Sequence, residues 1–140
     1  MDQVVELDSS TECINDLESL LRSFLKDDCK CEVLFGDILI SLMEAVQNAI
    51  KHGNQFDTQK KVELIMVQQS GRLELSVSDE GQGFDHRNLL PNPTEEKCIT
   101  ECDGRGVYLM KSLSHDFCYK NKGRTVVLKF DLKTAPGLVG

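Results

Sequence analysis

No apolar run in this sequence approaches the length of a membrane span, and the first residues lack the basic and apolar segments of a signal peptide. We therefore expect the chain to remain in the cytoplasm. Basic residues are in the minority, because 16 Lys and Arg stand against 23 Asp and Glu, a net charge of −7. This balance argues against nonspecific binding of nucleic acid and against docking on an anionic membrane. It leaves ATP open, because a phosphate site needs only local hydrogen-bond donors.

The sequence also lacks the cysteine spacing of a zinc site. Its cysteines include two close pairs, Cys29 with Cys31 and Cys98 with Cys102. Neither pair has the two-residue spacer of a zinc knuckle, and no histidine lies near either one. We expect reduced thiols, and a structural zinc ion remains the less favoured alternative.

Length and composition predict one soluble globular domain over residues 1–140. Of these residues 40% are hydrophobic and 28% are charged, which is ordinary for a folded protein. No internal repeat is evident.

Between residues 36 and 53 the apolar residues recur with helical spacing. One side of the predicted helix carries Leu39, Leu42, Met43, Val46, Ala49 and Ile50. The other side carries a narrow polar stripe of Asp37, Ser41, Glu44, Asn48 and Lys51 or His52. A solvated helix face is the ordinary explanation of such a stripe, so it gains meaning only from the segments downstream. Gly53 followed by Asn54 is typical of a C-terminal helix cap.

The remaining patterns predict an α+β fold, a mostly antiparallel mixed sheet with helices on one face. Residues 3–7 suit a short strand, and Ser9 with Glu12 forms a capping-box pattern before a helix that ends near Lys26. Strict alternation over 62–66 and 73–77 predicts two strands joined at Ser70 and Gly71. A closing hairpin is expected from 117–120 and 125–130.

Asp79 continues the inward parity of the second of these strands. A lone buried carboxylate is unfavourable unless it is hydrogen-bonded, so this position favours a ligand contact, although an Asp that caps the following turn explains it equally well.

Gly81 and Gly83 then allow close backbone approach or positive φ. Residues 86–103 have no clear period and suit a lid. Gly104 and Gly106 open a helical pattern, which is a ready anion site but on its own only an ordinary turn.

Taken in order, these segments resemble the GHKL superfamily of ATP-binding domains, which is shared by type II topoisomerases, heat-shock chaperones, sensor histidine kinases and mismatch-repair ATPases. The motifs that carry the resemblance are EAVQNAIKHG (44–53), DEGQGFD (79–85), LPNPT (90–94) and GRGVYLM (104–110). Within the superfamily the chain is most similar to bacterial anti-sigma regulatory factors, which are serine protein kinases. The resemblance implies a two-layer sandwich of the GHKL type.

The resemblance implies a role for each matching residue. Asp79 would accept a hydrogen bond from the adenine amino group, which favours ATP over GTP. Asn48 would ligate Mg²⁺ through its amide oxygen. Glu44 would act as the general base for the attacking hydroxyl, or else support the metal shell from outside.

The glycine segments and one lysine complete the implied site. Gly81 and Gly83 would let the chain pass close under the base. Backbone amides of Gly104, Arg105 and Gly106 would close over the phosphates. Lys51 would reach the phosphates, or remain a solvated lysine.

Two positions depart from the family pattern. A Gly-Thr pair commonly enters the last strand, and its threonine supports the adenine-binding Asp. Here strand parity puts Arg124 rather than Thr125 on the face shared with Val126, so we leave Thr125 out of the site, and Ser78 or water would take its place. Asp103 stands where close relatives often have a small residue, and an acid there would repel phosphate.

The sequence therefore favours an ATP- and Mg²⁺-dependent protein serine/threonine kinase that also acts as an anti-sigma factor. By resemblance it would sequester a sigma factor and phosphorylate a serine of an anti-anti-sigma antagonist, and relatives suggest a homodimer. The alternative is a catalytically silent module in which ATP binding only selects a protein partner.

Overall fold

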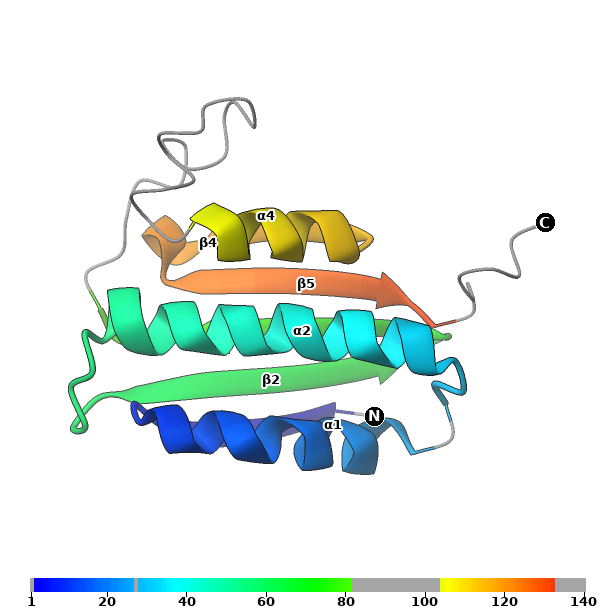
Figure 1. The fold of residues 1–140 in the computed structure, drawn as a ribbon, viewed down its shortest axis with the longest axis horizontal. Helices are drawn as coiled ribbons and strands as arrows, with labels where there is room; N and C mark the ends of the chain where they lie inside the picture. The colour runs from blue at the N-terminus through cyan, green and yellow to red at the C-terminus, as the bar shows by residue number, and fades with distance from the viewer. Residues whose placement is uncertain (1, 27, 82–103, 133–140) are drawn as a thin grey trace.

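The computed structural model describes residues 2–26, 28–81 and 104–132 as a sheet covered on one face by helices (Figure 1). The elements, in chain order, are β1 (Asp2–Asp8), η1 (Thr11–Asp16), α1 (Leu17–Leu25), α2 (Glu32–Asn48), η2 (Ala49–Gly53), β2 (Lys61–Gln69), β3 (Arg72–Ser78), α4 (Gly104–Leu113), β4 (Asp116–Lys120), η4 (Asn121–Gly123) and β5 (Thr125–Asp131). The expected α+β class is confirmed.

The sheet has the strand order β1-β2-β3-β5-β4, and every pairing among these described strands is antiparallel. The expectation of a mixed sheet is thus corrected for this part of the chain. The alternation predicted for β2 and β3 is confirmed, because its six inward residues, Val62, Leu64, Met66, Leu73, Leu75 and Val77, are all buried. Their hairpin turns at Ser70 and Gly71, whose φ angles of 55° and 78° suit the right-handed twist of the strands.

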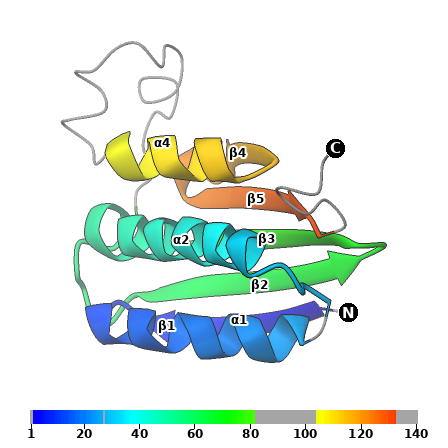
Figure 2. The same cartoon turned by 45° about the vertical axis from the view of Figure 1, so that its right-hand side comes forward.

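Helix α2 lies in the middle of the helical layer, with α1 on one side and α4 on the other (Figures 1 and 2). Its buried residues Ile38, Leu42 and Val46 recur every four residues, Ile50 continues the stripe in η2, and all four have no exposed surface. This stripe packs between the sheet and the two flanking helices, so the position of α2 is set by the core.

The helix differs from the sequence prediction at its start and along its polar stripe. It begins at Glu32, four residues before Gly36. Ser41 is fully buried rather than solvated, and its Oγ donates to the Asp37 carbonyl at 2.8 Å. Neighbouring helices on both flanks cover more of α2 than a two-faced helical wheel allows, which leaves a narrower polar face.

The first helical segment also begins one residue later than the capping pattern indicated. Ser10, not Ser9, is the N-cap, and its Oγ accepts the Glu12 N–H at 3.2 Å. The segment starts as the 3₁₀ helix η1 and continues as α1. Ser9 is instead buried, and its Oγ donates to the Lys60 carbonyl at 2.6 Å.

One helix, formed by α2 and η2 over Glu32–Gly53, is long and apolar enough to cross a membrane by length and composition alone. The expectation that no segment approaches that length is therefore corrected. Half of its most apolar stretch is buried inside the described structure. The central core helix of a two-layer sandwich has this composition because it is covered on several sides.

Candidate functional site

The segments predicted to carry the site meet at one end of the structure. The C-terminal end of α2, the residues after β3 and the first turn of α4 lie together there in both views (Figures 1 and 2). Glu44 and Asn48 stand half-buried near the end of α2, and Lys51 is exposed in η2. Gly104, Arg105 and Gly106 form the start of α4, as predicted. Gly83 and the expected lid over 86–103 lie outside the described residues.

The end of α2 is widened into a π-helical turn. The Asn54 N–H donates to the Ala49 carbonyl, five residues back, at 2.8 Å. The Phe56 N–H donates to the Ile50 carbonyl at 2.9 Å. Asn48 precedes this turn without capping it, so its amide is not committed to the helix end. π-Turns of this kind are frequent at functional sites because they redirect the chain locally.

Gly53, Asp79 and Gly81 form a close-packed cradle at this end. A Cβ at Gly53 would overlap the Asp79 carboxylate, with Oδ1 only 2.6 Å away. A Cβ at Gly81 would overlap the Gly53 carbonyl and lie 3.0 Å from Asp79 Oδ1. Neither Gly53 nor Gly81 has a left-handed φ. Both glycines are therefore required for close approach rather than for backbone conformation.

Burial raises the pKa of the Asp79 carboxyl above its ordinary value, and this effect outweighs three opposing ones. The Gly81 N–H, which donates to Oδ1 at 2.8 Å, stabilises the charged form, as do the more distant charges of Arg124 and Lys60. The Asp79 N–H is held by the Arg124 carbonyl at 2.9 Å. Among the described residues only Oδ1 has a hydrogen-bond donor, so Oδ2 can accept one from a ligand.

Arg124 departs from the parity argument, whereas Thr125 follows it. Arg124 lies before β5 with helical backbone angles and is exposed, so it does not share the inner face with Val126. Thr125 is on the outer face, as expected, but it is buried and pairs with Ser78 across the strands, with 2.8 Å between their hydroxyl oxygens. Asn121 Nδ2 also donates to Thr125 Oγ1, at 3.0 Å. This hydroxyl pair braces the strand ends beside Asp79.

Sequence reasoning missed Gly53 as a site residue and assigned it only to a helix cap. The helix does end there, but the glycine is needed because residue 79 packs against it. A cap and a steric requirement give the same local signal, a glycine after a helical pattern. Only the pairing of that glycine with an inward Asp in a later strand distinguishes them.

Metal ligands do not gather elsewhere in the described parts of the chain, where no three His, Cys, Asp or Glu side chains could hold one ion. Cys13, Cys29, Cys31 and Cys118 are half-buried free thiols. Cys98 and Cys102 lie outside the described residues.

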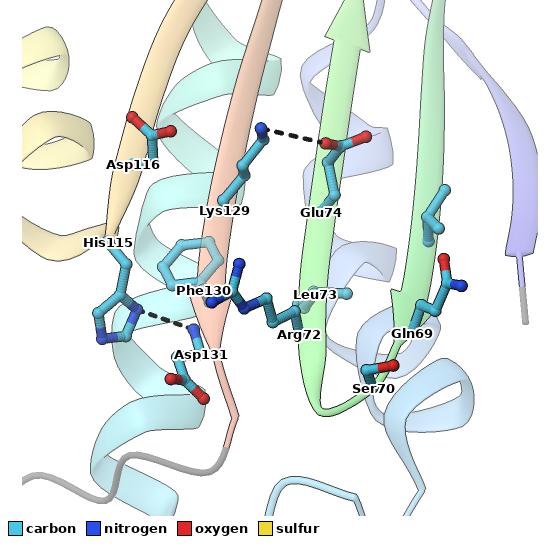
Figure 3. A pocket seen from close by; sticks show the side chains of 11 residues that line it. Gln69, Ser70, Arg72, Leu73, Glu74, His115, Asp116, Lys129, Phe130 and Asp131 are labelled. Atoms are coloured by element: carbon cyan, nitrogen blue, oxygen red, sulfur yellow. Dashed lines mark hydrogen bonds and ion pairs between the residues drawn. The ribbon is translucent and has the colours of Figure 1, made fainter.

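A separate hollow of about 620 Å³ opens at the other end of the sheet (Figure 3). Two of its charged side chains form an ion pair, in which Lys129 Nζ lies 3.7 Å from Glu74 Oε1. The His115 Nδ1 accepts the Asp131 N–H at 2.9 Å. Arg72 lines this hollow at the start of β3, so the length of that strand separates it from Asp79 by about 20 Å. The hollow is therefore distinct from the cradle.

The two glycines of the α2–η2 helix make a matched test of the cradle. Gly36→Ala should raise the free energy of unfolding by about 0.5–1 kcal/mol, because a Cβ there meets nothing within 4 Å and alanine favours a helix. Gly53→Ala should lower it by about 1–3 kcal/mol through overpacking against Asp79. Urea denaturation measures both. Equal stabilisation by the two alanines would contradict the cradle.

The raised pKa of Asp79 gives a pH-dependent prediction. The folded state holds the Asp79 proton more tightly than the unfolded state, so this group lowers stability progressively as pH rises from about 4 through the folded pKa. Asp79→Asn removes this pH-dependent loss of stability, because an amide does not titrate in this range. The variant's stability relative to wild type should therefore increase over this window, as measured by denaturation of nucleotide-free protein between pH 4 and 7.5. A difference that is constant with pH, or that falls, would contradict the burial of a charged carboxylate.

The geometry agrees with what comparison with known proteins finds. A family model, described as the histidine kinase-like ATPase domain, matches residues 7–130. The serine-protein kinase RsbW of Bacillus subtilis (strain 168) is 32% identical over an alignment of 98 residues, and the match covers 66% of this chain and 61% of that protein. The chain thus spans less than two thirds of the length of this relative. Because the family model covers nearly the whole chain and every described site segment, the expected resemblance is confirmed, and the chain belongs to the histidine kinase-like ATPase family.

Proposed function

We propose that this chain binds ATP with Mg²⁺ at the α2–β3–α4 end and acts as a protein serine/threonine kinase of the anti-sigma type. The observation that carries the proposal is the cradle of Gly53, Asp79 and Gly81. It holds a half-buried carboxylate against the backbone of two glycines, where a Cβ on either glycine would overlap protein atoms. One carboxylate oxygen accepts the Gly81 N–H, and the other has no donor among the described residues. In an ATPase domain, such a carboxylate beside two glycines suits the binding of a flat base that offers a hydrogen-bond donor.

Asp79 recognises the base. Its buried carboxylate needs a donor, and the adenine 6-amino group supplies one, whereas guanine presents a carbonyl oxygen at the same position. The Gly81 N–H already occupies Oδ1, so the second oxygen takes the ligand. Desolvation of the carboxylate strengthens this hydrogen bond and makes the wrong base more unfavourable.

The triphosphate lies toward the polar face of α2 and the start of α4. Asn48 offers a hard amide oxygen that suits Mg²⁺, and the ion, when bound, neutralises charge on the phosphates. The free backbone amides at Gly104, Arg105 and Gly106 donate to phosphate oxygens at a helix N-terminus. Lys51 is exposed one turn beyond Asn48, where its long side chain can reach the same charge.

Glu44 stands one turn before Asn48 on the same face of α2. A carboxylate at this distance from the metal ligand accepts the proton of an attacking serine hydroxyl while the phosphoryl group is transferred. Proton transfer of this kind needs only a positioned base.

The proposed partners follow from the family resemblance and from the relative that is named a serine-protein kinase. They are a sigma factor, held by the kinase, and a small anti-anti-sigma antagonist that receives the phosphoryl group on a serine. The proposal includes action in the cytoplasm and a homodimer of the chain.

Nucleotide titration tests the binding roles. Asp79→Asn should weaken ATP about ten- to a hundred-fold, because a hydrogen bond to a charged group contributes about 1.5–3 kcal/mol and 1.4 kcal/mol is a factor of ten. Asn48→Ala should weaken ATP mainly when Mg²⁺ is present. Calorimetry with and without Mg²⁺ measures both, and Asp116→Asn in the distant hollow is the control that should change nothing. Unchanged affinity in Asp79→Asn and Asn48→Ala would remove both assignments.

Transfer of labelled γ-phosphate to the cognate antagonist tests the kinase. Glu44→Gln should slow transfer at least about a hundred-fold, the usual contribution of a general base, while ATP still binds. Glu32→Gln, at the other end of the same helix, should leave transfer unchanged. If wild type binds ATP and labels no serine, the chain is a nucleotide-gated binding module and the kinase proposal fails.

A further inference from the structure

Asn54 is a buried polar residue that the proposed ATP site does not use. It follows Gly53 at the end of η2, and only 1% of its surface is exposed. Its Nδ2 donates to Ser9 Oγ at 2.8 Å and to the Lys61 carbonyl at 3.0 Å. Its Oδ1 accepts the Glu80 N–H at 2.8 Å. Both ends of the amide are therefore occupied by protein.

These partners fix the orientation of the amide without ambiguity. A carbonyl oxygen can only accept and a backbone N–H can only donate, so Nδ2 must face Lys61 and Oδ1 must face Glu80. Ser9 extends the network, because its Oγ donates to the Lys60 carbonyl. One side chain thus links the ends of β1, η2 and β3 to the start of β2.

The network bears directly on the cradle. Glu80 lies between Asp79 and Gly81, and the Gly81 N–H holds Asp79 Oδ1. On the other side, Asn54 is bonded through its backbone to Gly53, which packs against the same carboxylate. The amide therefore joins the two segments whose separation decides where the Asp79 carboxylate lies.

The backbone after Asn54 shows that this segment is held against its own preference. Gln55 and Phe56 both have left-handed φ angles, 52° and 60°, which are unfavourable for residues with side chains. Backbone hydrogen bonds from the Asn54 and Phe56 N–H groups hold this turn, and the Asn54 side chain ties it to Glu80. Loss of that tie should loosen the contact between Gly53 and Asp79.

We propose that Asn54 is a positioning residue for base recognition, acting through its Oδ1 bond to the Glu80 N–H. The inference rests on the proposed ATP site. Asn54 does not touch the nucleotide; it keeps the Asp79 carboxylate at the place where it distinguishes a 6-amino group from a 6-carbonyl group. Its loss should affect selectivity between bases more than affinity for the triphosphate.

The test compares ATP with inosine triphosphate, which carries a carbonyl in place of the 6-amino group. The two ligands have the same charge, so the ratio of their dissociation constants cancels effects on the phosphates. Wild type should prefer ATP by about ten- to a hundred-fold, the range set by one charged hydrogen bond. Asn54→Ala should reduce this ratio to within about threefold. If that variant does not fold, Asn54→Ser replaces it, because its hydroxyl is too short to reach Glu80.

Two further variants separate positioning from stability. Ser9→Ala breaks the network at its far end, so it should lower the unfolding midpoint and keep the wild-type ratio. Asn54→Asp keeps an oxygen for the Glu80 N–H, so it should preserve the ratio within about twofold even if both affinities fall. A wild-type ratio in Asn54→Ala or Asn54→Ser, or a lost ratio in Asn54→Asp, overturns the inference. A wild type without any ATP preference instead overturns the proposed role of Asp79 and leaves nothing for Asn54 to position.

Discussion

The contact between the Asp79 carboxylate and the backbone at Gly53 is the constraint on which the candidate site depends. It joins the end of the core helix to the end of a central strand, with no room for a single methyl group between Gly53 and Asp79, which are separated by 25 residues of chain. Because both elements belong to the packed core, the carboxylate is held by rigid structure on two sides. A recognition group placed this way loses little entropy when a ligand binds.

The same contact disfavours the charged form of Asp79 and leaves one of its oxygens available to a ligand. Burial raises the pKa of Asp79, so the folded protein holds a carboxylate in a place that disfavours its charge. The Gly81 amide and the hydroxyl pair of Ser78 and Thr125 organise the surroundings, yet one acceptor oxygen remains open. Such an arrangement is typical of sites where a ligand completes the hydrogen bonding.

Local patterns predicted the elements well because their causes are local. The period-2 alternation of β2 and β3 follows from one buried face, and Asp79 could be placed inward by the same parity. The capping serine was misplaced by one residue because Ser9 is committed to Lys60 and Asn54, which are distant in sequence. Ser41 and Gly53 were misread for the same reason: their environments are made by elements that a helical wheel does not contain.

The most direct test of the account is a crystal structure of the chain with Mg²⁺ and a non-hydrolysable ATP analogue. We expect the adenine amino group within hydrogen-bonding distance of Asp79, the base over Gly53 and Gly81, and the phosphates between Asn48 and the start of α4. A nucleotide bound elsewhere, for example in the hollow beside His115, with the Asp79 carboxylate untouched, would contradict it.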